Sequence, residues 1–119
     1  MTGTETLTNK TIIAKSLKET KTIQGTSNVL NLSSSNLFVK TITAATVFSL
    51  TNLPPNDGTV YSFILDLTNG GNFGVTWFSG IKWSKGTAPT LTANGRDVVG
   101  FYTHDGGTTW TGVISKDHK

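Results

Sequence analysis

The stretch LTNGGNFGVTWFSGIKWSKGTAPTLTANGRDVVGFYTHDGGTTWTG, residues 67–112, decides the fold of this chain. It contains all three tryptophans, many β-branched residues, and several turns built on glycine, asparagine or aspartate. Short β-prone segments separated by such turns are typical of an antiparallel all-β protein. The stretch carries no pattern of an enzyme site, so it indicates a binding or structural role.

Similar segments and turns continue from Gly25 toward this stretch. In Thr59–Thr68, the side chains of Tyr61, Phe63, Leu65 and Leu67 recur at a period of two, which places them on one face of a strand. Ser33–Asn36 and Ser79-Gly80 are turn sequences, and the second is a candidate two-residue hairpin. We predict an antiparallel β-sandwich, with a jelly-roll-like arrangement as one form. The expected strands are 29–32, 37–41, 47–51, 59–68, 73–78, 81–83, 96–103 and 109–115.

The chain divides near Gly25 into an arm and a body. Residues 1–24 are polar, contain no aromatic residue and have too few apolar side chains to form a core. We predict an extended N-terminal attachment arm over residues 1–24 and a β-sandwich domain over residues 25–119. The arm is either solvated and disordered or ordered against a neighbouring subunit or an upstream shaft. Its candidate assembly residues are Leu7, Lys10, Ile12, Ile13 and Leu17.

The composition argues against a nucleic-acid partner. The net charge is +3, the charged fraction is 14%, and threonine makes up about a fifth of the chain. Charged residues usually supply about 25% of a soluble protein. A surface of hydroxyl and amide groups suits extended assemblies and glycan contact, whereas the dispersed lysines form no basic cluster among aromatic residues. We therefore expect no nucleic acid to bind.

The sequence also lacks thiols and long apolar runs. It has no cysteine, so neither a disulfide nor a thiolate is available. No apolar run approaches the ~18 residues of a membrane-spanning helix, and residues 1–10 lack the apolar core of a signal peptide. We expect no membrane insertion, and synthesis and folding in the cytoplasm.

The titratable residues form no catalytic or metal-binding pattern. His104 precedes a turn and His118 lies in the C-terminal tail. Asp57-Gly58 and Asp105-Gly106 are better explained as turns than as the paired acids of a glycosidase. Neither a calcium loop nor zinc-ligand spacing occurs. We predict a protein that is not an enzyme and binds no metal or cofactor.

Aromatic residues beside turns are the candidates for ligand binding. Trp77 and Trp83 flank Ser79-Gly80, and Trp110 follows the turn at Asp105. Such rings can stack on sugars, but buried aromatic rings also contribute heavily to core stability. Packing in the core or between subunits is the favoured interpretation, and sugar stacking is the alternative. The candidate ligand-binding residues are Trp77, Lys82, Trp83, Tyr102, His104 and Trp110.

The order of these motifs resembles a known kind of module. Leu67–Gly71, Val75–Trp77, Ser79–Trp83 and Gly86–Thr92, followed by Asp97–Phe101 and Asp105–Trp110, are similar to a module of bacteriophage tail fibres and other virion appendages. Glu5–Ile12 resembles a short motif found in phage fibre shafts before a distal domain. Together these motifs cover more than half of the chain.

The resemblance implies a non-enzymatic virion structural protein that is assembled in the host cytoplasm. It implies a homotrimer with a β-rich knob, which contacts other virion proteins as a tail-fibre or fibre-tip component. Loops around Trp77–Trp83 and Tyr102–Trp110 would touch a host-surface glycan. A capsid decoration protein, with residues 1–24 as a strap, is the alternative. A stand-alone carbohydrate-binding module is a weaker third interpretation.

Overall fold

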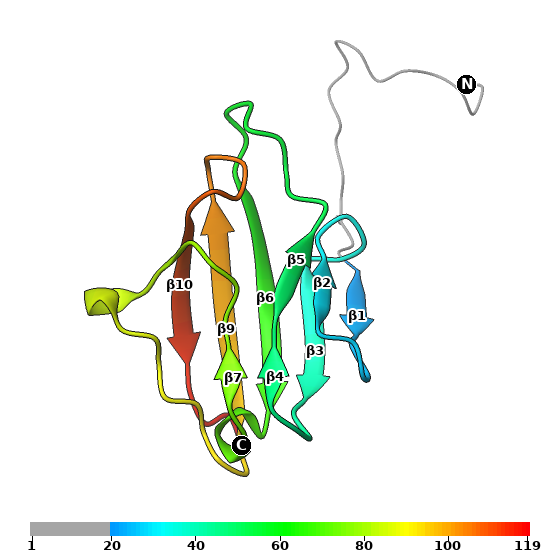
Figure 1. Cartoon of the computed structure of the whole chain (residues 1–119), viewed down its shortest axis with the longest axis vertical. Helices are drawn as coiled ribbons and strands as arrows, with labels where there is room; N and C mark the ends of the chain where they lie inside the picture. Colours follow the sequence, from blue (N-terminus) through cyan, green and yellow to red (C-terminus); the bar gives the residue numbers. More distant parts are fainter. Residues whose placement is uncertain (1–19) are drawn as a thin grey trace, which may run out of the picture.

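The computed structural model describes residues 20–119, which form ten β-strands and two short 3-10 helices (Figure 1). The predicted arm residues Leu7, Lys10, Ile12, Ile13 and Leu17 lie outside the described residues. The elements are β1 (Lys21–Ile23), β2 (Val29–Asn31), β3 (Leu37–Thr41), β4 (Thr46–Val47), β5 (Ser49–Thr51), β6 (Tyr61–Thr68), η1 (Gly70–Asn72), β7 (Val75–Thr76), β8 (Ile81–Lys82), η2 (Ser84–Gly86), β9 (Arg96–Thr103) and β10 (Trp110–Ser115).

Six strands form a single mixed sheet in the order β1-β3-β6-β9-β10-β8. Strands β1, β3 and β6 are parallel, β9 is antiparallel to both β6 and β10, and β8 is parallel to β10. Two short parallel pairs, β2 with β5 and β4 with β7, lie in front of this sheet (Figure 1). The prediction of a β-rich body is therefore confirmed. The prediction of purely antiparallel strands is wrong, and an antiparallel sandwich is not confirmed.

The parallel pairs arise because the chain winds between the large sheet and the short sheets. Residues 24–36 connect β1 to β3 and contain β2, and residues 42–60 connect β3 to β6 and contain β4 and β5. Parallel neighbours need a connection of a dozen or more residues, which a helix usually supplies. Here short strands supply it. Because these connections consist of short strands and turns, the sequence looks like a series of antiparallel hairpins, although β1, β3 and β6 are parallel.

Two turns with hairpin-like sequences carry the chain from one sheet to another. Ser33–Asn36 separates β2 from β3, but β2 pairs with β5, whereas β3 pairs with β1 and β6. Ser79-Gly80 separates β7 from β8, but β7 pairs with β4 and β8 pairs with β10. The predicted hairpin at Ser79-Gly80 is therefore wrong. Turn chemistry specifies where a chain reverses, and side-chain packing selects the strand with which it then pairs.

Alternation along the strands gives the large sheet two different faces. Phe63, Leu65 and Leu67 of β6 are buried on one face, as the period of two predicts. We call this the inner face, because β2, β5, β4 and β7 cover it (Figure 1). Burying each such side chain contributes roughly 1.5–3 kcal/mol. Its core residues are Leu30, Leu32, Phe38, Ile42, Phe48, Phe63, Leu65, Leu67, Val99, Phe101 and Trp110.

One buried carboxylate ties the loop before β9 to the C-terminal tail. The Asp97 carboxylate accepts hydrogen bonds from the Thr92 backbone N–H at 2.7 Å, the Thr92 hydroxyl at 2.7 Å and the Asp117 backbone N–H at 2.9 Å. Burial alone would raise the pKa of Asp97, but these hydrogen bonds outweigh it and lower the pKa below its ordinary value. Asp97 is therefore a buried anion whose charge is satisfied by local donors.

Candidate functional site

The structure divides the predicted ligand-binding residues between the two faces of the large sheet. Trp110 belongs to the inner-face core, and Trp77 and Trp83 pack against that core. Tyr102 lies on the opposite, outer face. Lys82 also lies on the outer face, because Thr111 pairs with Tyr102 on one side and with Lys82 on the other. The six residues therefore do not form a single site.

Trp110 is part of the core and does not form an exposed platform. Its side chain is 0% exposed. Its ring makes edge contacts with Phe63, Phe78 and Tyr61, with centroids 5.2, 6.1 and 6.3 Å away. Aromatic rings prefer such edge-to-face arrangements, which add to the stability gained by burial. This placement agrees with the packing interpretation of Trp110.

Trp77 and Trp83 contact each other at the side of the same aromatic core. Their ring centroids are 5.3 Å apart in an edge arrangement, and each lies 5.7 Å from the ring of Phe101. Trp83 covers Gly112, where an added Cβ would lie 2.6 Å from the indole ring. Both rings are half-buried. Trp77 and Trp83 therefore cover β9 and β10, with part of each ring left open to solvent.

Tyr102 and His104 form a small exposed pair on the outer side. Their rings stack with centroids 6.4 Å apart. Tyr102 is 44% exposed and lies in a row with Ser62 and Thr111 of the neighbouring strands. The side chains of this row carry hydroxyl groups, which suits contact with another surface.

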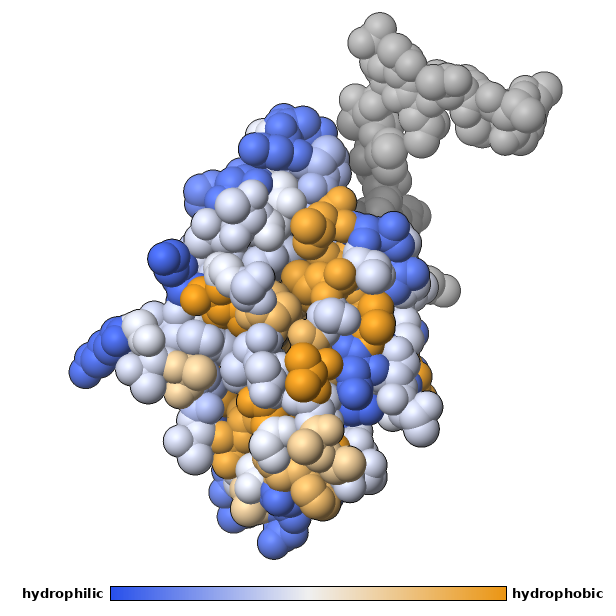
Figure 2. All heavy atoms as spheres, in the orientation of Figure 1, coloured by the Kyte–Doolittle hydropathy of each residue, from blue (hydrophilic) through white to orange (hydrophobic). Residues whose placement is uncertain are grey.

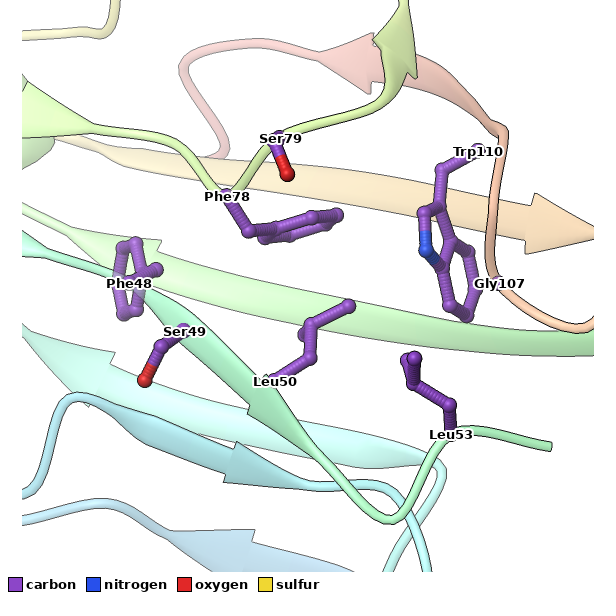
Figure 3. Close-up of a pocket in the computed structure, with 8 residues that line it drawn as sticks. All are labelled: Phe48, Ser49, Leu50, Leu53, Phe78, Ser79, Gly107 and Trp110. Atoms are coloured by element: carbon purple, nitrogen blue, oxygen red, sulfur yellow. The ribbon is translucent and has the colours of Figure 1, made fainter.

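A pocket of about 360 Å³ lies where two of the predicted loops meet (Figure 3). The segment after β7 and the start of β10 are joined here by a backbone hydrogen bond, which the Trp110 backbone N–H donates to the Gly80 carbonyl at 2.9 Å. In Figure 3, Leu50 and Leu53 face Phe78 and Trp110 across the pocket. Figure 2, seen from the side of the short sheets, shows apolar residues gathered over this part of the molecule. The lining residues are Phe48, Ser49, Leu50, Leu53, Phe78, Ser79, Gly107 and Trp110.

The lining of this pocket is mixed, with about as much polar as apolar surface. Ser49 and Ser79 belong to its lining, and the Ser49 hydroxyl points away from the pocket (Figure 3). The indole N–H of Trp110 is buried and has no hydrogen-bond partner within residues 20–119. A donor without a partner costs free energy when it is buried. The pocket thus combines apolar side chains with polar surface, a combination that suits a small, partly apolar group.

The sequence predicted the loops of this pocket but not most of its side chains. Trp110 was a candidate residue, and Phe78 and Ser79 lie within the predicted Trp77–Trp83 loop. Phe48, Leu50 and Leu53 come from β5 and its flanking residues, far from the tryptophans in sequence. The alternation of Phe48 and Leu50 was the available signal, but it indicates only that both face a core.

The turn that closes one side of the pocket is held by a local network. The Asp105 carboxylate accepts hydrogen bonds from the Thr109 backbone N–H and the Thr103 hydroxyl, both at 2.9 Å. The Thr103 hydroxyl also accepts a bond from the Gly107 N–H at 3.0 Å. The Thr109 and Thr103 hydrogen bonds lower the pKa of Asp105. Asp105 therefore acts in the turn, as its sequence predicts, and positions Gly107 at the pocket.

Residues 20–119 contain no group of three or more histidine, cysteine or acidic side chains arranged to hold a metal ion. Within the same residues, no helix has the length and apolar character needed to cross a membrane. Comparison with protein-family models, with curated proteins and with solved structures finds no match to this chain.

Proposed function

We propose that this chain is a structural protein of a bacteriophage virion, without enzymatic activity, and a component of a tail fibre or fibre tip. The observation that carries the proposal is the outer face of the large sheet. Leu37, Val39, Ile64, Val98 and Val113 lie on this face, in neighbouring strands, and none of them is fully buried. A contiguous exposed apolar patch on a folded domain is typical of an interaction surface.

The partner that suits this face is another copy of the chain. The centre of the face is nearly neutral, because Asp66 and Arg96 neutralise each other in a two-bond ion pair at 2.8 Å. Lys21 and Lys82 of the same face, which form no ion pair within residues 20–119, lie on the two outermost strands. An apolar surface with a neutral centre can be buried against a second copy of itself at little electrostatic cost. This supports the homotrimer that the resemblance to phage fibres implies. A mixed sandwich, with the short sheets as its second layer, is the architecture that we propose for each subunit.

Host attachment forms the second half of the proposal. The pocket lined by Phe78, Leu50 and Leu53 is the site that we propose for a small group of a host-surface glycan, such as a methyl or acetyl substituent. The Phe78 ring and the two leucines supply apolar contact, and the polar part of the lining can fix the orientation of the bound group. A single weak site of this kind gains avidity when several subunits hold copies together.

The mass of the full chain in solution tests the assembly proposal. A trimer of the 12.7 kDa chain is expected by light scattering coupled to size exclusion. A chain that stays monomeric at about 100 µM would contradict a self-assembling fibre component. Binding of the natural chain to a panel of surface glycans then tests attachment separately. A Phe78→Ser variant, which removes a ring from the pocket, should lose this binding.

A capsid decoration protein is the second candidate, and the same outer face favours it. In that case the apolar surface would be buried on capsid subunits instead of on copies of the chain. The expected result is a monomer in solution that binds tailless capsids, with binding lost in an Ile64→Lys variant. A monomer that binds neither capsids nor tails would contradict both candidates.

A further inference from the structure

Within residues 20–119, strand β1 ends the large sheet with an unpaired edge. Two backbone hydrogen bonds beside β1 show which residues face β3. The Thr20 carbonyl accepts a bond from the Asn36 N–H at 3.3 Å, and the Gln24 backbone N–H donates a bond to the Val39 carbonyl at 2.9 Å. The N–H and C=O of one strand residue point to the same side, and the side alternates along the strand. The backbone groups of Lys21 and Ile23 therefore point to the open edge, where they can accept another strand.

The side chains at this edge are also uncovered. Ile23 is 70% exposed, the largest exposed fraction among the large apolar side chains of residues 20–119. Ile23 lies beside Val39 of β3, at the edge of the outer face. Lys21, two residues earlier on the same face, makes no ion pair with the described residues. A strand placed beside β1 would cover the apolar side chain and bring a partner to the charge.

The register of the sheet indicates which residues would fit there. Lys21, Thr22 and Ile23 pair with Leu37, Phe38 and Val39, so paired positions are sixteen residues apart. The same step toward the N-terminus leads to Glu5, Thr6 and Leu7. The sequence Thr4-Glu5-Thr6-Leu7 repeats the pattern of Thr20-Lys21-Thr22-Ile23, with two threonines at the same positions and an aliphatic residue at the end of each.

The residue after this pattern fits the same interpretation. Gly25 adopts a left-handed conformation with φ of 55° just after β1. Its counterpart sixteen residues earlier is Asn9, and asparagine is the residue that best tolerates this conformation after glycine. With this sixteen-residue step, residues 8–20 would form the connection, and residues 24–36, a connection of the same length, already join β1 to β3. A chain segment of this length therefore suffices for one more parallel step.

We propose that Glu5–Leu7 add to the open edge of β1 as a parallel strand of the same chain. Glu5 then lies beside Lys21 and pairs with its ammonium group, Thr6 lies beside Thr22, and Leu7 covers Ile23. Parallel neighbours are about 4.8 Å apart, so the carboxylate and the ammonium group are within reach of each other. Because the segment belongs to the same chain, its effective concentration at the edge is in the millimolar range, which favours it over a segment from another copy.

The proposal is limited to β1 and does not extend to β2. The Gln24 side chain donates a hydrogen bond to the Val29 carbonyl at 2.8 Å, so the corresponding edge of β2 is already partly occupied. The inference also stands independently of the proposed virion role. It assigns residues 5–7 to the body of the protein and leaves fewer residues for contact with a neighbouring subunit.

Disulfide trapping in the full chain tests this pairing. The natural sequence has no cysteine, so introduced thiols report only on each other. In a Leu7→Cys/Ile23→Cys variant, adjacent strands place the two Cα atoms at a distance that a disulfide spans. A matched control, Leu7→Cys/Val113→Cys, places the second thiol on the same face of the sheet but on β10. We expect the first pair to oxidise at least ~10-fold faster than the control, as a monomer.

The charge pair gives a second readout of the register. In the Leu7→Cys/Ile23→Cys background, Glu5→Lys should slow oxidation, and adding Lys21→Glu should restore the rate. Equal rates in the two double-cysteine variants would overturn the proposal. Rapid oxidation that yields only disulfide-linked dimers would also overturn it, because the segment would then pair with another copy. A rate that does not respond to either charge change would rule out the sixteen-residue register.

Discussion

The two faces of the six-stranded sheet use the same strands for opposite purposes. On the inner face, Phe63 and Phe101 are buried in a network of aromatic rings, with centroids 5.0 Å apart. One residue away on the same strands, Ile64 is 44% exposed and Tyr102 is 44% exposed on the outer face. The comparison separates side chains that the fold needs from side chains that the fold tolerates. Apolar residues on the outer face require an explanation other than folding.

The inner face should dominate the stability of the protein. Replacing Trp110 with alanine removes a fully buried ring and its contacts with Phe63 and Phe78. We expect a loss of about 3–5 kcal/mol in the free energy of unfolding, measured by urea denaturation. The control Val113→Ala, on the outer face of the same strand, should cost less than ~1 kcal/mol. Similar losses in both variants would contradict the assignment of the faces.

The unpaired indole N–H of Trp110 sharpens this prediction. Trp110→Phe keeps an aromatic ring in the core and removes the donor that lacks a partner among the described residues. We expect the variant to lose about 1–2 kcal/mol, well below the alanine variant, because the loss of ring volume is partly offset by the removal of the buried donor. A loss as large as that of alanine would indicate that the N–H is satisfied by an ordered water molecule.

Asp97 tests the polar part of the inner face. Asp97→Asn replaces one of the two oxygens that accept hydrogen bonds from Thr92 and Asp117. We expect a loss of about 2–3 kcal/mol at neutral pH by urea denaturation. The isosteric side chain is its own packing control. A change below about 0.5 kcal/mol would mean that the charge contributes nothing to the fold.

The same variant makes a prediction about pH. The pKa of Asp97 is lowered in the folded state, so the unfolded chain takes up the proton first as the pH falls. The stability due to Asp97 is complete above its ordinary pKa of about 4 and is lost as the pH falls through the lowered value. The difference in stability between the natural protein and Asp97→Asn should therefore shrink below about pH 4. A constant difference would contradict this sign.

The sequence predicts the composition of the inner face better than its topology. The period of two in Tyr61–Leu67 correctly places Phe63 and Leu65 in the core, because alternation is a local property of a strand. The parallel pairing of β1, β3 and β6 depends on which distant strands cover the same apolar surface, and no local pattern records it. For the same reason the loops of the pocket were predicted, whereas Phe48 and Leu53 were not.

Two glycines provide a matched test of the faces at the level of a single methyl group. A Cβ at Gly112, on the inner face, would lie 2.6 Å from the Trp83 ring, whereas a Cβ at Gly100, on the outer face, meets only a Val113 methyl group at 3.3 Å. Gly112→Ala should cost about 1–3 kcal/mol by overpacking. Gly100→Ala should change stability by less than ~0.5 kcal/mol. Thermal or urea unfolding of the pair measures both, and equal costs would contradict the packing difference.

A charge placed on the outer face should have the smallest effect on folding. The same charge should have the largest effect on the proposed assembly. Ile64 lies between Leu37 and Gly100 near the middle of this face, and its side chain already contacts solvent. Ile64→Lys should leave the stability of the isolated chain within about 0.5 kcal/mol. It should nevertheless abolish association, because a lysine buried between two apolar faces has no partner for its charge. Ser62→Lys, two residues earlier on the same face but at its hydroxyl-lined end, is the matched control and should keep the proposed oligomer. If Ile64→Lys unfolds the chain while Ser62→Lys does not, the outer face belongs to the core of each subunit, and the distinction between the two faces fails.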